Sequence, residues 1–144
     1  MYGLFLLIHS WVRWAVLAAG LMAVVRGGSR DEQAGKWFTM LLDVQILIGL
    51  LLYFWLSPVT GAALGDFGAA MKNPQLRFYA VEHVAGILIA TALAHIGRAR
   101  VRKARDERTR ARVAAIFYGL ALIAILASIP WPGLPAGRPL FRLY

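Results

Sequence analysis

The sequence predicts an all-α integral membrane protein, an up-and-down bundle of four transmembrane helices in one domain over residues 1–144. Hydrophobic residues make up 60% of the chain and its mean hydropathy is +0.62, whereas soluble domains contain roughly 45–50% apolar residues. The charged residues cluster between and beside long apolar stretches, instead of recurring along one face of each helix as they do in soluble proteins. Both observations place most of the chain inside a lipid bilayer.

Four apolar stretches follow one another along the chain, each close to the ~20 residues that a helix needs to cross a hydrocarbon core about 30 Å thick. They cover approximately residues 3–25, 38–56, 78–97 and 113–129. Because lipid offers no hydrogen-bond partners, the backbone groups of each stretch must pair within it, which predicts four α-helices. We expect residues 98–112 to extend the third or fourth helix into water, and residues 57–77 to hold a short helix at the membrane surface.

The basic residues are divided unequally between the two sides of the predicted bundle. The connections after the first and third stretches carry eleven of them, namely Arg26, Arg30, Lys36 and the eight between Arg98 and Arg112. The opposite side carries Lys72, Arg77, Arg138 and Arg142. Because basic loops stay in the cytoplasm, this distribution predicts a multi-pass membrane protein with both termini outside the cytoplasm.

The net charge of +9 does not indicate a nucleic-acid-binding protein, because half of the basic residues lie in one run next to a membrane stretch. Such a run is typical of a topology signal and of contact with anionic lipids, so the predicted partner is the lipid bilayer and not nucleic acid. The chain has no cysteine, which excludes disulfides, thiolate metal sites and covalent haem attachment. It also lacks a zinc-type cluster, a Walker loop and a dinucleotide fingerprint.

Two histidines lie at nearly the same depth in the predicted membrane. His9 is about six residues from the outer end of the first helix, and His83 is about five residues from the outer end of the third. The first and third helices of an up-and-down bundle are diagonal neighbours that run in the same direction. Ionisable residues inside a membrane are costly and commonly functional. Two imidazoles that face each other across the diagonal are placed to bind one haem from both sides, since imidazole is a common axial ligand of haem iron.

The helical face below His83 carries only small residues, Gly86, Ala90 and Ala94, at spacings of three and four. The missing side chains would leave room for a porphyrin, with Gly86 nearest to the histidine. The alternative is that the small residues only allow two helices to pack closely, which is common in membranes.

Arg13 lies one helical turn below His9 on the same face of the first helix. A guanidinium there is placed to bind a haem propionate, a quinone oxygen or another anionic group. The alternative is a structural ion pair with Glu82 of the third helix. Near the other end of the bundle, His95 and Asp43 enter from the same side, so we expect a hydrogen bond between them. Its role is structural or, alternatively, part of a proton path.

Three strings resemble a known family. They are His9-Ser-Trp-Val-Arg-Trp, Leu76-Arg-Phe-Tyr-Ala-Val-Glu-His83, and Ser128-Ile-Pro-Trp-Pro followed by Gly137-Arg-Pro-Leu-Phe. They look like parts of small bacterial four-helix membrane proteins described as cytochrome b or cytochrome b subunit, and the resemblance spans nearly the whole chain. It implies a b-type haem bound between His9 and His83. Di-haem membrane cytochromes pair four histidines for two haems, and this chain has three histidines, so a single haem is expected.

Together, the residues and the resemblance predict a membrane b-type cytochrome with one haem b near the outer face. His9 and His83 are the predicted metal ligands, and Arg13 and Gly86 are the further cofactor-binding residues. The predicted role is electron transfer in the bacterial inner membrane to or from a quinone or a redox partner, as a subunit of a larger respiratory complex or as a homo-oligomer. Enzyme activity, such as quinone reduction, is expected only through the cofactor. Two alternatives stay open. One is a cofactor-free accessory subunit of a larger complex, and the other is a copper-handling or solute-transport protein that uses both histidines with Met71 as a soft ligand.

Overall fold

The computed structural model describes residues 1–29 and 32–141, and these residues fold into helices without a strand. Within them, four helical segments are long and apolar enough to cross a membrane. They cover Tyr2–Arg26, Gln33–Leu56, Pro74–Lys103 and Glu107–Ala127. The predicted all-α bundle of four membrane helices is therefore confirmed for the described ranges. Arg30 and Arg142, which contribute to the predicted charge asymmetry, lie outside them.

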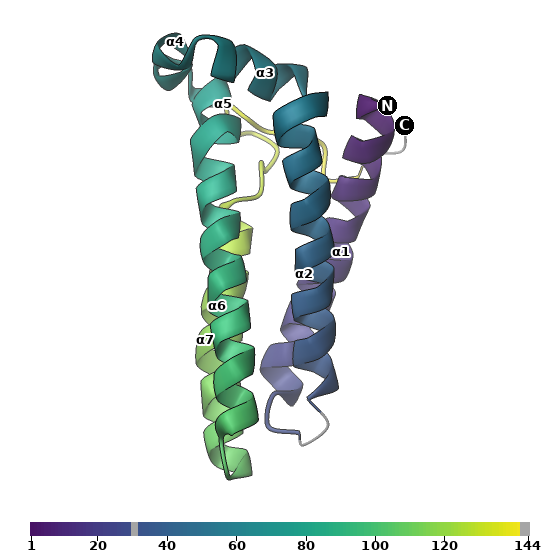
Figure 1. The fold of residues 1–144 in the computed structure, drawn as a ribbon, viewed down its shortest axis with the longest axis vertical. Coiled ribbons are helices and arrows are strands. Elements are labelled where there is room, and N and C mark those ends of the chain that lie inside the picture. The colour runs from purple at the N-terminus through teal and green to yellow at the C-terminus, as the bar shows by residue number, and fades with distance from the viewer. Residues whose placement is uncertain (30–31, 142–144) are drawn as a thin grey trace.

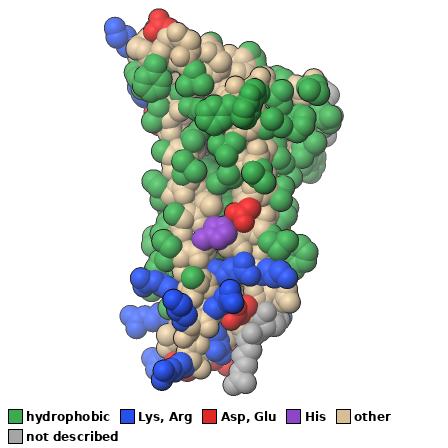
Figure 2. Space-filling model, in the orientation of Figure 1, with side chains coloured by type: hydrophobic (Ala, Val, Ile, Leu, Met, Phe, Trp, Pro, Cys, Tyr) green, Lys and Arg blue, Asp and Glu red, His purple; other side chains and the backbone are tan. Residues whose placement is uncertain are grey.

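The four long helices pack as an antiparallel ring (Figure 1). α1 (Tyr2–Arg26) contacts α2 (Gln33–Leu51) and α7 (Glu107–Ala127), and α6 (His83–Lys103) contacts α7 and α2. α1 and α6 therefore lie on a diagonal and run in the same direction, as the sequence predicts. The start of α1 and the segment that follows α7, up to Phe141, lie at one end of the bundle in Figure 1, which we call the terminal end. Figure 2 shows Lys and Arg side chains gathered at the opposite end, the basic end.

Small side chains in α6 and α7 let these two helices approach closely. Ala90 and Ala94 of α6 are fully buried, as is Ala121 of α7. Tyr118 fills the space beside them, and its ring packs edge-to-face against Phe38 of α2 with the ring centres 5.7 Å apart. In lipid there is little hydrophobic gain when helices associate, so van der Waals packing of this kind holds the bundle together.

At the basic end, α6 and α7 continue beyond the apolar stretches, as predicted. α6 ends at Lys103 and α7 begins at Glu107, and the basic residues in 98–112 are mostly exposed. Asp106 caps α7, because its carboxylate accepts hydrogen bonds from the amide and the hydroxyl of Thr109 at 2.8 and 2.7 Å. The hydrogen bond from the hydroxyl is the main cause that lowers the pKa of Asp106. The cap therefore stays charged, as suits a helix N-terminus.

At the terminal end, the connection between α2 and α6 forms three short helices, where the sequence predicts one. They are α3 (Pro58–Gly65), α4 (Phe67–Lys72) and α5 (Pro74–Arg77). Each begins after a side chain that accepts a hydrogen bond from the backbone of the first turn, and these caps are Ser57, Asp66 and Asn73. Figure 1 shows this connection lying across the end of the bundle, where it covers the space between the long helices.

Gly97 should tolerate a side chain less well than Gly119, although both lie within membrane helices. A Cβ atom at Gly97 would stand 2.5 Å from the Cβ of Phe117, whereas no neighbouring atom of the described residues lies within 4 Å of a Cβ at Gly119. We expect Gly97→Ala to lower the free energy of unfolding by about 1–3 kcal/mol through overpacking. Gly119→Ala should leave it unchanged or raise it by up to about 1 kcal/mol. Thermal unfolding in one detergent measures both, and equal melting temperatures would contradict the packing described.

Candidate functional site

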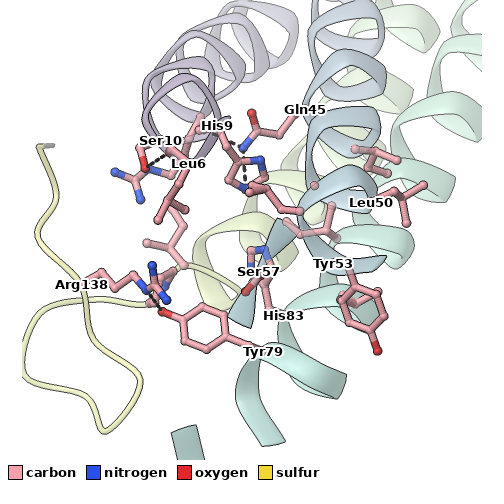
Figure 3. A pocket seen from close by; sticks show the side chains of 18 of the residues that line it. Leu6, His9, Ser10, Gln45, Leu50, Tyr53, Ser57, Tyr79, His83 and Arg138 are labelled. Atoms are coloured by element: carbon pink, nitrogen blue, oxygen red, sulfur yellow. Dashed lines mark hydrogen bonds between the residues drawn. The ribbon is translucent and has the colours of Figure 1, made fainter. Parts of the chain in front are cut away.

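A cavity of about 410 Å³ lies in the terminal half of the bundle, between α1, α2 and α6 and beside the segment that follows α7 (Figure 3). Its volume falls within the range of about 300–1,000 Å³ that is usual for sites that bind small molecules and cofactors. Most of its wall is aliphatic, from residues such as Leu6, Leu42 and Ile87. A few polar side chains interrupt this wall, and both predicted haem ligands are among them.

His9 and His83 meet in this cavity from diagonal helices. His9 comes from α1 and His83 from the first residue of α6. Their ring centres are 6.2 Å apart and their planes are inclined at 69°. Figure 3 shows the two imidazoles close to each other in the cavity. The structure therefore brings together the two residues that the sequence places at equal depth.

The imidazole of His83 is oriented by the end of α7. Its Nδ1 lies 2.7 Å from the backbone oxygen of Ser128, the residue that ends the helix. A carbonyl oxygen can only accept, so Nδ1 carries the proton and donates it, and the lone pair is on Nε2. Gly86 does not line the cavity, because a Cβ atom there would collide with the side chain of Ser128. Of its two interpretations, close helix packing is the one that these contacts support, and this packing brings the carbonyl within reach of His83.

His9 is held by Gln45 of α2, a residue whose role the sequence does not reveal. The amide nitrogen of Gln45 donates to the backbone oxygen of His9 at 3.0 Å and lies 3.2 Å from the ring Nε2. Because the same amide nitrogen serves both contacts, the Nε2 of His9 accepts and its Nδ1 carries the proton. Gln45 is only 6% exposed, so this arrangement is fixed inside the bundle.

Four buried side-chain polar atoms of the described residues have no hydrogen-bond partner, and three of them belong to residues that line this cavity. These three are Nδ1 of His9, Oε1 of Gln45 and Nε of Arg13, and the fourth is Nε of Arg98. Buried polar groups are nearly always hydrogen-bonded, and each unpaired group costs about 1–3 kcal/mol. Their concentration around one cavity makes it the candidate ligand site.

Arg13 lines the cavity, but it does not pair with Glu82, so the ion pair that the sequence offers as an alternative is wrong. Its Nη2 donates to the backbone oxygen of Leu140 at 2.6 Å, and the indole nitrogen of Trp14 donates to the same oxygen at 3.3 Å. Glu82 instead pairs with Arg77, at 2.8 Å on the exposed surface. Arg77, which is closer to Glu82 in the sequence, pairs with its carboxylate, so Arg13 faces the cavity without a carboxylate partner among the described residues.

Arg138 reaches the same cavity from the segment that follows α7. It donates to the hydroxyls of Tyr79 and Tyr2 at 2.7 and 3.2 Å, and its guanidinium lies over the Tyr79 ring. The hydroxyl of Tyr79 donates in turn to the backbone oxygen of Ala136 at 2.7 Å. Burial opposes the charge of Arg138, but its interactions with the two tyrosines outweigh burial and raise its pKa. With Arg13, the described lining holds two cations and no carboxylate, so it favours an anionic group.

Two π-helical turns border the cavity. η1 (Leu52–Leu56) ends the second long helix and η2 (Phe78–Glu82) leads into α6. The hydroxyl of Tyr53 donates to the backbone oxygen of Ala80 at 2.9 Å and so joins the two turns. Such turns within long helices are often found at functional sites. Because η2 comes directly before His83, it sets the direction from which the imidazole enters the cavity.

The remaining candidate residues lie away from the cavity. Met71 of α4 packs against a small cluster at the terminal end that includes Ala63 and Ala70, so it does not join the two histidines. His95 and Asp43 form the predicted hydrogen bond at 2.8 Å, on the surface of the bundle. Among the described residues, no group of three or more His, Asp or Glu side chains is placed to hold a metal ion.

The hydroxyl of Tyr79 should hold the segment that follows α7 over the cavity. In Tyr79→Phe, Arg138 loses an acceptor and Ala136 loses a donor, and hydrogen bonds that involve a charged group contribute about 1.5–3 kcal/mol. We expect the backbone amides of residues 134–141 to exchange with deuterium about tenfold faster or more. Hydrogen–deuterium exchange measured by mass spectrometry tests this, with Tyr53→Phe as the control that removes a hydroxyl elsewhere. Equal exchange in both variants would contradict the role assigned to Tyr79.

Comparison of the chain with protein-family models, with curated proteins and with solved structures finds no match in any of the three. The resemblance of the sequence strings to small b-type cytochromes therefore stays a prediction. The function of the chain has to be inferred from the chemistry of the cavity.

Proposed function

We propose that the chain is a membrane-bound b-type cytochrome that holds one haem b between His9 and His83 and transfers electrons to or from a quinone or a redox partner. The observation that carries the proposal is the 6.2 Å between the ring centres of the two imidazoles. An imidazole nitrogen lies about 2.0–2.1 Å from a bound metal ion, so His9 and His83 are close enough that both would hold one haem iron placed between them. The pair therefore has the spacing that bis-histidine ligation requires.

The hydrogen bond of His83 fits this role, whereas His9 would have to exchange a contact. The contact between His83 and Ser128 keeps the proton on Nδ1 and leaves Nε2 for the metal, which is how most metal-bound histidines are oriented. Ligation through the Nε2 of His9 would replace one contact with Gln45, which keeps its hydrogen bond to the His9 backbone. Gly86 supports the site through Ser128 and does not face the cofactor.

The rest of the cavity also suits a porphyrin with carboxylate substituents. The aliphatic wall matches the apolar ring and keeps water away from it, and Arg13 and Arg138 would neutralise the propionates. When bound, the haem supplies one-electron chemistry, and the chain contributes ligation, charge compensation and a dry environment. A membrane chain that holds a single haem suits a subunit of a larger respiratory complex.

For the orientation, we propose that the basic end faces the cytoplasm of a bacterial cell and that both termini face the periplasm. The support is the charge distribution, because the basic run 98–112 lies at the basic end with Arg26 and Lys36. The cavity then lies in the half of the membrane nearer to the periplasm, where a partner outside the cytoplasm can exchange electrons with it.

Removal of either ligand should abolish haem binding. The purified protein is expected to contain about one haem per chain and to show a Soret shift and an α band in its reduced-minus-oxidised spectrum, as a bis-histidine haem does. His9→Ala and His83→Ala should each reduce the haem content to near zero, whereas His95→Ala should retain it. Far-ultraviolet circular dichroism and gel filtration show whether each variant is folded.

A colourless wild-type protein would contradict the proposal and favour the cofactor-free accessory subunit. An unchanged spectrum in both ligand variants would also contradict it. Elemental analysis of the same sample separates iron from copper and so tests the copper-handling alternative.

The orientation can be tested with single cysteines, because the chain has none of its own. Lys72 and Arg108 are exposed at opposite ends of the bundle. In spheroplasts, an impermeant maleimide should label Lys72→Cys directly and Arg108→Cys only after detergent is added, because the basic run stays in the cytoplasm. Labelling in the reverse order would place both termini in the cytoplasm.

A further inference from the structure

An ionisable pair stands on the outer surface of the bundle, where α2 and α6 meet. Nε2 of His95 and Oδ1 of Asp43 are 2.8 Å apart, and the two side chains are 45% and 49% exposed. Figure 2 shows a histidine and an acidic side chain together on this face, with apolar side chains towards one end and Lys and Arg side chains towards the other. Neither residue lines the cavity that holds His9 and His83.

The pair lies just inside the residues that mark the basic end of the bundle, towards its apolar middle (Figure 2). Asp43 is six residues beyond Trp37 in α2, and His95 is three residues before Arg98 in α6. At a rise of about 1.5 Å per residue, the two lie about 9 and 4.5 Å deeper than these boundary residues. Ionisable side chains at such depths are costly and rarely face lipid, so an exposed pair calls for a covering surface.

The hydrogen bond between Asp43 and His95 occupies one polar atom of each side chain and leaves the other polar atom available. Among the described residues, Oδ2 of Asp43 and Nδ1 of His95 have no further hydrogen-bond partner. The free oxygen of Asp43 can only accept a hydrogen bond, and the free ring nitrogen of His95 donates one when the imidazole is protonated. A covering surface must therefore present one donor and one acceptor at the same depth.

The surroundings of the pair suit close contact with another helix. On α6, Ala92 and Ala99 lie one turn on either side of His95, and both are exposed. On α2, Met40 and Leu47 flank Asp43, and they are 44% and 66% exposed. Small residues allow helix backbones to approach closely in membranes, and the larger apolar ones surround the polar contact.

We propose that this face joins two copies of the chain into a parallel dimer with twofold symmetry. Two copies inserted in the same direction can be related only by an axis along the membrane normal, so each residue meets its counterpart at its own depth. The acceptor on Asp43 of one copy then meets the donor on His95 of the other, and the reverse contact follows by symmetry. A second copy supplies the required donor and acceptor automatically, whereas any other chain would need both groups at this one depth.

Cysteine cross-linking in native membranes tests the dimer, since the chain contains no other cysteine. Ala92→Cys and Ala99→Cys place single thiols beside the pair. Ala115→Cys is the matched control, because Ala115 is an exposed alanine of α7 that lies level with Ala99, as the contact between Gly97 and Phe117 indicates. Oxidation should link the two α6 variants into dimers at least roughly tenfold more than the control, because a twofold axis brings equivalent positions together.

A second comparison tests the polar pair itself. Asp43→Asn in the Ala92→Cys background should lower the cross-linked fraction about tenfold at equal protein density in the membrane, which corresponds to about 1.4 kcal/mol. The exchange of the two residues, Asp43→His with His95→Asp, keeps the ion pair in reversed order and should restore the cross-linking.

Four results would overturn the proposal. The first is equal cross-linking at Ala92 and Ala115, and the second is single-step photobleaching of labelled protein in liposomes at low density. The third is cross-linking from this face to a different chain. The fourth is a variant with the exchanged pair that inserts in the membrane but does not form the dimer. None of these measurements depends on haem, so the outcome is independent of the function proposed for the cavity.

Discussion

The close contact between α6 and α7 positions most of what surrounds the cavity. Gly86 lets the end of α7 approach until the backbone oxygen of Ser128 reaches His83. A backbone oxygen at a helix end has no partner in its own helix, and lipid supplies none. The hydrogen bond therefore satisfies both the backbone oxygen of Ser128 and the imidazole of His83. A single methyl group between the two helices would separate them and leave both groups unpaired.

Backbone oxygens that need a hydrogen-bond donor also explain the other polar contacts around the cavity. Arg13 donates to the backbone oxygen of Leu140 and Tyr79 to that of Ala136, so the non-helical segment after α7 is held by side chains from the helices. Gln45 donates to the backbone of His9 in the same way. Each of these side chains uses some of its polar atoms for hydrogen bonds that hold the structure together. Arg13 and Gln45 each keep one unpaired polar atom as well, and both residues line the cavity.

The four helices and the depth of the histidines could be predicted from the sequence because both depend only on position along the helix axis. The length of an apolar stretch and a fixed rise per residue are enough to place His9 and His83 at one level. The rotation of each helix about its axis could not be predicted, because helices that are apolar on all sides do not reveal which side faces protein. For that reason the sequence places Gly86 beside the porphyrin and leaves Gln45 without a role, whereas Gly86 faces Ser128 and Gln45 binds His9.

The partners of the arginines could not be predicted for a different reason. The segment after α7 has no periodic pattern, so nothing in it indicates that it turns back over α1 and meets Arg13. The contact of Arg138 with Tyr79 likewise joins residues far apart in the chain. By contrast, the hydrogen bond between His95 and Asp43 follows from helix direction and depth alone, and the structure confirms it.

The path of the segment after α7 has a consequence for the order of assembly. Synthesis proceeds from the N-terminus, so α1 with His9 and α6 with His83 are complete before residues 130–141 exist. Those residues contribute Pro130, Arg138 and Phe141 to the wall of the cavity. During biogenesis there is therefore a stage at which both imidazoles are present while one wall is still missing. At that stage the two histidines would be more accessible to a bulky rigid ligand than they are in the finished chain.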